Sequence, residues 1–104
     1  MLQEYIDLSK NKLVGTIPSF EPLNMLTYVD LHSNRLEGPL PQIVSSQNSD
    51  SLIEELYFAD NYLSGTLPSD YGSHLLTLKA FHVDATFISG TIPESYGKLT
   101  NLSR

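Results

Sequence analysis

The sequence predicts a repeat fold in which each of four similar units contributes a short β-strand with one buried face. Three observations support this prediction: a recurring glycine-to-proline motif, an apolar pair upstream of each motif, and an asparagine between the two. The motif Gly-x-(Ile/Leu)-Pro begins at Gly15, Gly38, Gly65 and Gly90, with spacings of 23, 27 and 25 residues. Within 104 residues this period indicates a single domain built from repeated units.

The first element of each unit is a short strand. Its apolar residues occupy alternate positions, which is typical of a strand with one buried face because successive side chains point to opposite sides. A Gly and a Pro at fixed offsets in each unit exclude one continuous helix. The apolar pairs are Ile6/Leu8, Val29/Leu31, Leu56/Phe58 and Phe81/Val83.

An asparagine follows the strand in three of the four units. The chain must turn sharply there, which leaves backbone groups without a partner in a sheet. Asparagine carries both a donor and an acceptor, so stacked asparagines can satisfy the turns of their own and of neighbouring units. We call Asn11, Asn34, Asn61 and Thr86 the asparagine ladder, in which Thr86 replaces the fourth asparagine. Because threonine offers only a hydroxyl, we expect this rung to be weaker.

Aligned in this way, the units share the template L-x-x-L-x-L-x-x-N-x-L-x-G-x-I-P, which resembles the plant-type leucine-rich repeat. The resemblance implies an α/β-type solenoid, a right-handed superhelix with a parallel β-sheet on its concave face. It also implies a second short sheet through the Gly-x-Ile-Pro segment and a convex side of mostly irregular or 3₁₀ turns. The resemblance covers a single domain, 1–104, in four repeats at about residues 3–25, 26–52, 53–77 and 78–101.

Three further features are placed by the same resemblance. Tyr71-Gly72 and Tyr96-Gly97 fit its helical-turn segment, and the polar insertion at residues 45–51 is expected to be a surface loop on the convex side. Neither end shows the polar cap that a repeat array needs, and the family's caps usually carry paired cysteines, of which this chain has none. We therefore expect an uncapped fragment of a longer array, with further repeats of its own full-length chain as neighbours.

Composition and charge exclude several classes of function. Twelve acidic and six basic residues give a net charge of -6, and so few Lys and Arg could not neutralise a series of phosphates. We therefore expect no nucleic-acid partner and no direct membrane contact. No apolar run approaches the about 18 residues that a spanning helix needs. The acidic N-terminus lacks the basic region of a signal peptide, and zero cysteines exclude a thiolate metal site.

The residues that flank the strand leucines are expected to form the concave face. Tyr5 and Tyr28 should be adjacent in one row across the strands, with Asp7, Asp30 and Tyr57 in the next. Tyrosine is favoured at interfaces, and a basic or mixed peptide would suit the acidic field. The alternative is that these are ordinary solvated positions of an acidic protein. The candidate ligand-binding residues are Tyr5, Asp7, Tyr28, Asp30, His32, Glu55, Tyr57 and His82.

Catalytic and metal chemistry find little support in the pattern. His32 and Ser33 are neighbours that point to opposite sides of a strand, and no nucleophile elbow or Gly-rich anion loop accompanies them. His82, Asp84 and Asp60 could meet on adjacent strands, but two residues on one face of a strand are common by chance. We expect no enzymatic activity, no metal and no cofactor.

The favoured interpretation is a module for recognising a protein or peptide. The resemblance implies an extracellular or cell-surface location and a place in the ligand-sensing region of a receptor-like protein or kinase, a signalling protein that is membrane-associated at full length. The same resemblance leaves two alternatives, a secreted inhibitor of a cell-wall-degrading enzyme such as polygalacturonase and a structural spacer. Asn101-Leu102-Ser103 is an N-x-Ser sequon, a glycan acceptor if the protein enters the secretory route.

Overall fold

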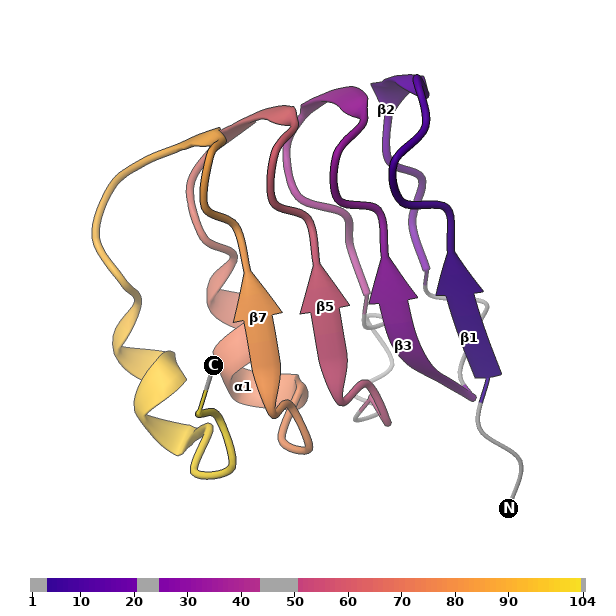
Figure 1. Cartoon of the computed structure of the whole chain (residues 1–104). Coiled ribbons are helices and arrows are strands. Elements are labelled where there is room, and N and C mark those ends of the chain that lie inside the picture. Colours follow the sequence, from indigo (N-terminus) through magenta and orange to yellow (C-terminus); the bar gives the residue numbers. More distant parts are fainter. Residues whose placement is uncertain (1–3, 21–24, 44–50, 104) are drawn as a thin grey trace.

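The chain forms two parallel sheets that run along a solenoid of four coils. In the computed structural model, the described residues are 4–20, 25–43 and 51–103. The first sheet has the order β1-β3-β5-β7, and Figure 1 shows its strands side by side. We number the four coils after these strands and call the solvent-facing side of the sheet the concave face. The strands are β1 (Glu4–Asp7), β3 (Leu26–Asp30), β5 (Glu55–Tyr57) and β7 (Ala80–His82).

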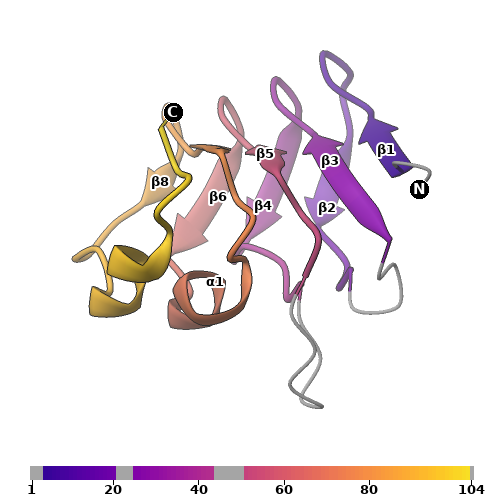
Figure 2. The same cartoon turned by 90° about the horizontal axis from the view of Figure 1, so that it is seen from below.

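The second sheet has the order β2-β4-β6-β8 and lies on the other side of the core (Figure 2). The sequence predicted this sheet within the Gly-x-Ile/Leu-Pro segment, but most of its residues lie upstream, between the ladder position and the glycine. Proline explains the shift, since it has no N–H to donate to a neighbouring strand. The strands are β2 (Val14–Thr16), β4 (Arg35–Gly38), β6 (Tyr62–Gly65) and β8 (Phe87–Ile88).

Short helices form the convex side of the last two coils. The prediction of 3₁₀ or irregular turns is correct for η1 (Glu94–Lys98), whereas α1 (Ser69–His74) is an α-helix. The difference lies in the closing bond: Leu75 N–H donates to Tyr71 O, four residues back, and Leu99 N–H donates to Tyr96 O, three residues back. The insertion at residues 45–51 lies, except for its last residue, outside the described residues.

The convex helices pack closely, and glycine allows it. An added Cβ at Gly72 of α1 would lie within 2.6 Å of the backbone of Ser95 and Tyr96 in η1. The Tyr71 hydroxyl donates to Pro41 O at 2.6 Å, and that of Tyr96 donates to Pro68 O at 2.9 Å. Each of these hydroxyls therefore ties its coil to the preceding one. None of the helices in the described ranges is long and apolar enough to cross a bilayer.

The hydrophobic core lies between the two sheets and under the convex side. Equivalent apolar residues stack from coil to coil, as in the row Ile6, Val29, Leu56 and Phe81. Burying such a side chain contributes about 1.5–3 kcal/mol. The largest fully buried side chains are Tyr71, Phe58, Ile53, Leu56, Leu63, Leu75, Leu78 and Val29.

A left-handed turn follows each strand of the first sheet and directs the chain toward the second. It falls on the same template position in every coil, at φ values of 54° to 60°, although none of the four residues is glycine. L-residues adopt this region at a cost, so the turn depends on its surroundings. The four residues are Lys10, Ser33, Asp60 and Ala85.

The asparagine ladder lies directly after these turns. The Asn34 amide donates to Leu8 O and Leu31 O, both at 3.0 Å, and its Oδ1 accepts the Leu13 N–H at 3.1 Å. Asn61 repeats this pattern one coil further on. Among the described residues, Thr86 bonds only within its own coil, to Val83 O and Ile88 N–H. The buried side-chain amides of Asn34 and Asn61 therefore each join two coils through three hydrogen bonds. The Thr86 hydroxyl joins no second coil within the described residues.

Candidate ligand-binding site

The concave face carries two rows of side chains that cross all four strands. The strand register aligns Tyr5, Tyr28, Glu55 and Ala80 in the first row and Asp7, Asp30, Tyr57 and His82 in the second. Both rows agree with the repeat alignment, because a solenoid stacks equivalent template positions. The candidate residues are therefore neighbours in space as well as in pattern.

Four rings of these rows form a continuous contact path, which we call the aromatic strip: Tyr5, Tyr28, Tyr57 and His82. Successive ring centroids are 5.2, 5.6 and 4.9 Å apart along this path, the last pair meeting edge to face. Such ring pairs add about 0.5–1.5 kcal/mol beyond their buried area. The strip is thus a preformed surface with little freedom to lose on binding.

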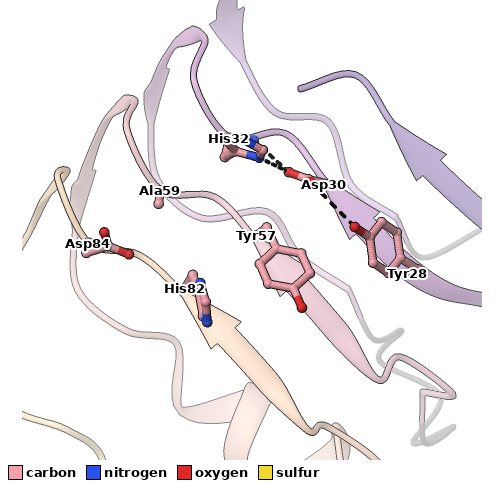
Figure 3. Close-up of a pocket in the computed structure, with 7 residues that line it drawn as sticks. All are labelled: Tyr28, Asp30, His32, Tyr57, Ala59, His82 and Asp84. Atoms are coloured by element: carbon pink, nitrogen blue, oxygen red, sulfur yellow. Dashed lines mark hydrogen bonds and ion pairs between the residues drawn. The ribbon is translucent and has the colours of Figure 1, made fainter. Parts of the chain in front are cut away.

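A pocket of about 300 Å³ lies beside the last three rings of the strip. Figure 3 shows its residues projecting from three neighbouring strands and the turns after them. The volume is at the lower end of the range for small-ligand sites and suits one side chain of a partner. Its lining residues are Tyr28, Asp30, His32, Tyr57, Ala59, His82 and Asp84.

Asp30 organises one wall of this pocket. Its carboxylate accepts hydrogen bonds from the His32 N–H at 3.1 Å and from the Tyr28 hydroxyl at 3.4 Å, and it lies 2.5 Å from His32 Nδ1. With only 7% of its surface exposed, Asp30 has little area left for a ligand. The sequence nominated it for direct contact, and the geometry instead makes it the residue that orients His32 and Tyr28.

The protonation states of the strip are biased by its surroundings. Partial burial raises the pKa of Tyr28, and the negative charge of Asp30 raises it further. The pKa of Asp7 is lowered because the Ser9 hydroxyl and N–H both donate to its carboxylate. At neutral pH, Tyr28 is therefore a neutral phenol, and Asp7 in the neighbouring row is an ionised carboxylate.

Two residues of the pocket, Ala59 and Asp84, are absent from the candidate ligand-binding residues that the sequence indicated, and the one with a functional group is Asp84. Its side chain is exposed at the pocket rim, and within the described ranges its carboxylate has no hydrogen bond or ion pair. The repeat alignment contained the signal, since Asp84 occupies the template position of His32, two residues after His82. A carboxylate beside aromatic rings is a favourable place for a cation.

The structure also places the side chains that were considered for hydrolytic and metal chemistry. The Ser33 hydroxyl donates to Asp60 at 2.9 Å, while the His32 ring faces Asp30, so no Ser–His pair forms. His82, Asp84 and Asp60 do not assemble: in the described part of the chain, no group of three or more His, Cys, Asp or Glu side chains could hold a metal ion. Asn101 of the sequon is exposed in a turn after η1.

Parallel strands, a stacked asparagine ladder and short convex helices define the class of leucine-rich solenoids. The family model described as Leucine Rich Repeat matches residues 4–22, 25–47 and 52–74, together more than half of the chain. The chain therefore belongs to the leucine-rich repeat family. The corresponding comparison with curated proteins gave no match.

Solved structures of plant receptor proteins share the fold. A chain of the BIR3–SERK2 complex from Arabidopsis thaliana is 37% identical, with a TM-score of 0.73 over 86% of this chain and 46% of that chain. A chain of the Arabidopsis receptor kinase HAESA complex with the peptide hormone IDA and the co-receptor SERK1 is 35% identical, with a TM-score of 0.79 over 94% and 16%. The BIR2 ectodomain from Arabidopsis thaliana is 33% identical, with a TM-score of 0.68 over 86% and 46%.

This chain spans less than half of the length of each of these solved chains. These solved chains come from a complex of a receptor kinase with a peptide hormone and a co-receptor, from the BIR3–SERK2 complex and from an ectodomain. It supports a role in ligand recognition in general, of a kind that leucine-rich repeat ectodomains perform as binding modules.

Proposed function

We propose that this chain recognises an extended peptide on its concave face, within the extracellular ligand-sensing region of a receptor-like protein or kinase. The observation that carries the proposal is the aromatic strip, which ends at a pocket whose Asp84 carboxylate has no partner among the described residues. Preorganised tyrosines supply contact area at a low entropic cost, which is typical of recognition surfaces.

The proposed ligand carries a basic side chain at the position that reaches the pocket. Ring faces of Tyr28 and Tyr57 and the carboxylate of Asp84 would then surround one cation. The net charge of -6 favours approach of a basic or mixed peptide over an acidic one. The complex of HAESA with a peptide hormone supports a peptide as the class of ligand.

A displayed library of random peptides, selected against the purified chain, tests this proposal. We expect the enriched peptides to contain Arg or Lys and to bind Tyr57→Ala about tenfold more weakly, since Tyr57 contacts both neighbouring rings of the strip. Val14→Ala is the matched control, because Val14 is exposed on the second sheet. Enriched peptides that bind Tyr57→Ala and the parent equally well would refute the proposal.

A further inference from the structure

One edge of the solenoid is divided into a basic half and an aromatic half. We call this edge the ridge: it is the line along which each coil passes from the first sheet to the second, and Figure 1 shows these turns side by side. The residue directly after the ladder position lies on the ridge and is exposed in every coil. These residues are Lys12 and Arg35 in the first two coils, and Tyr62 and Phe87 in the last two.

The aromatic half is arranged to receive a cation. The rings of Tyr62 and Phe87 are stacked, with centroids 6.3 Å apart, and are 56% and 66% exposed. A notch of about 270 Å³ beside them is lined by Asp60, whose carboxylate accepts the Ser33 hydroxyl at 2.9 Å. Glu37 is the register partner of Tyr62 across the second sheet. Exposed rings beside two carboxylates attract a cation, and a guanidinium can stack and accept this charge pairing at once.

The basic half supplies cations at the corresponding positions. Lys10 occupies the turn position that Asp60 has in the third coil, while Lys12 and Arg35 occupy the positions of the two rings. None of these three cations forms an ion pair with another of the described residues. The first half of the ridge is therefore the chemical complement of the second half.

The two halves also have the same spacing. Neighbouring strands of a sheet are about 4.8 Å apart, and the second sheet keeps one offset at every step, with the register pairs Val14–Arg35, Glu37–Tyr62 and Ser64–Phe87. The step from Lys12 to Arg35 therefore matches the step from Tyr62 to Phe87. A twofold axis that crosses the ridge between the second and third coils would set Arg35 of one copy against Tyr62 and Asp60 of the other. The same axis would set Lys12 against Phe87.

We propose that this chain associates with a second copy of itself, ridge against ridge, with the basic half of each copy on the aromatic half of the other. Such a contact is isologous, so it closes a dimer and does not continue into a filament. The ridge spans only four coils, which places the contact among small, reversible interfaces. The net charge of -6 opposes two copies at a distance, but at physiological salt this repulsion is screened beyond about 8 Å. The contact uses no residue of the aromatic strip and does not depend on the peptide proposal.

Sedimentation equilibrium of the purified chain at physiological salt tests the contact. We expect a monomer–dimer equilibrium below about 1 mM protein. Phe87→Ala should weaken the dimer about tenfold, because the twofold axis repeats the loss of the ring in both copies. Lys98→Glu is the matched control, since it reverses an exposed charge on η1 and should leave self-association unchanged. A parent that stays monomeric, or a Phe87→Ala protein that associates as strongly as the parent, would overturn the proposal.

Two charge reversals locate the contact on the ridge. Arg35→Glu and Asp60→Lys should each be monomeric alone, because like charges then meet across the twofold axis. Lys10 shows that the turn position of Asp60 accepts a lysine. An equimolar mixture of the two variants should dimerise, since each copy then presents the charge that the other has lost. A mixture that stays monomeric, or a single variant that dimerises as strongly as the parent, would show that the ridge is not the interface.

Discussion

The first and third coils are built on the same template and differ in what surrounds them. Leu13 of the first coil is 39% exposed, and Leu63, its equivalent in the third, is completely buried. Among the described residues, the exposed Asn11 bonds only within its own coil, to Leu8 O and Ser9 O, whereas Asn61 is buried and bonds to the coil before it. Equivalent residues thus contribute according to their neighbours, as expected for a stack in which each repeat contacts only the next.

The same difference appears as an apolar hollow on the first coil. A pocket of about 310 Å³ there is lined mainly by hydrocarbon, including Ile6, Leu8 and Phe20. Between the second and third coils, the corresponding leucines pack in the core. The contrast predicts that the free energy of unfolding lost on substituting a residue depends more on its burial and its contacts with neighbouring coils than on its residue type.

The largest expected effect comes from removing equivalent leucines. Leu63→Ala should lower the free energy of unfolding by about 2–5 kcal/mol, because it leaves a cavity between packed coils. Leu13→Ala should cost about 1 kcal/mol, since much of this side chain is already in water. Urea denaturation followed by circular dichroism measures both. Equal losses for the two variants would show that neighbouring coils do not set the contribution of a template leucine.

The asparagine ladder gives the next largest contrast. Asn34→Ala should cost about 1–3 kcal/mol, because the Leu13 N–H loses its acceptor and two carbonyls lose a donor. Asn11→Ala, at the exposed end of the ladder, should change stability by about 0.5 kcal/mol or less. Equilibrium unfolding of the pair tests the difference. An Asn34→Ala protein as stable as the parent would contradict a structural role for the ladder.

The stability contributed by the tyrosine hydroxyls on the convex side should depend on pH. Tyr71→Phe should cost about 1.5 kcal/mol, because Pro41 O loses its donor in a buried site. Burial raises the pKa of Tyr71 well above its usual value and also raises that of Tyr96. A raised pKa in the folded state means that this stability is complete below about pH 10, the pKa of unfolded tyrosine, and is lost as pH rises above it.

Thermal unfolding between pH 8 and strongly alkaline pH measures this dependence. The parent should lose stability above about pH 10, and the Tyr71→Phe/Tyr96→Phe double variant should lose less over the same interval. Tyr62→Phe is the matched control, since its exposed hydroxyl has no hydrogen-bond partner among the described residues. A double variant with the same alkaline profile as the parent would rule out these two hydroxyls as the cause.

The sequence predicted features that depend on the repeat period, and it missed those that depend on individual side-chain contacts. The rows of the concave face follow from the template because equivalent positions stack. The burial of Asp30 and its role in orienting His32 do not follow, since the pattern places every flanking residue in solvent. The bond from Tyr71 to Pro41 was also out of reach, because the segment between these residues contains the insertion that breaks the even spacing.

The smallest expected effect tests whether the fourth rung is weak because of its residue type. The N–H of Leu36 donates to Asn61 Oδ1 at 3.0 Å, and Leu63 is the equivalent residue one coil further on, facing Thr86. Thr86→Asn should supply the missing acceptor and a donor to the third coil, so that stability is unchanged or rises by about 1 kcal/mol. Urea denaturation beside Asn61→Thr, the reverse exchange, measures it. If Thr86→Asn destabilised the protein as much as Asn61→Thr, the local backbone of the fourth coil, and not the missing amide, would account for the weak rung.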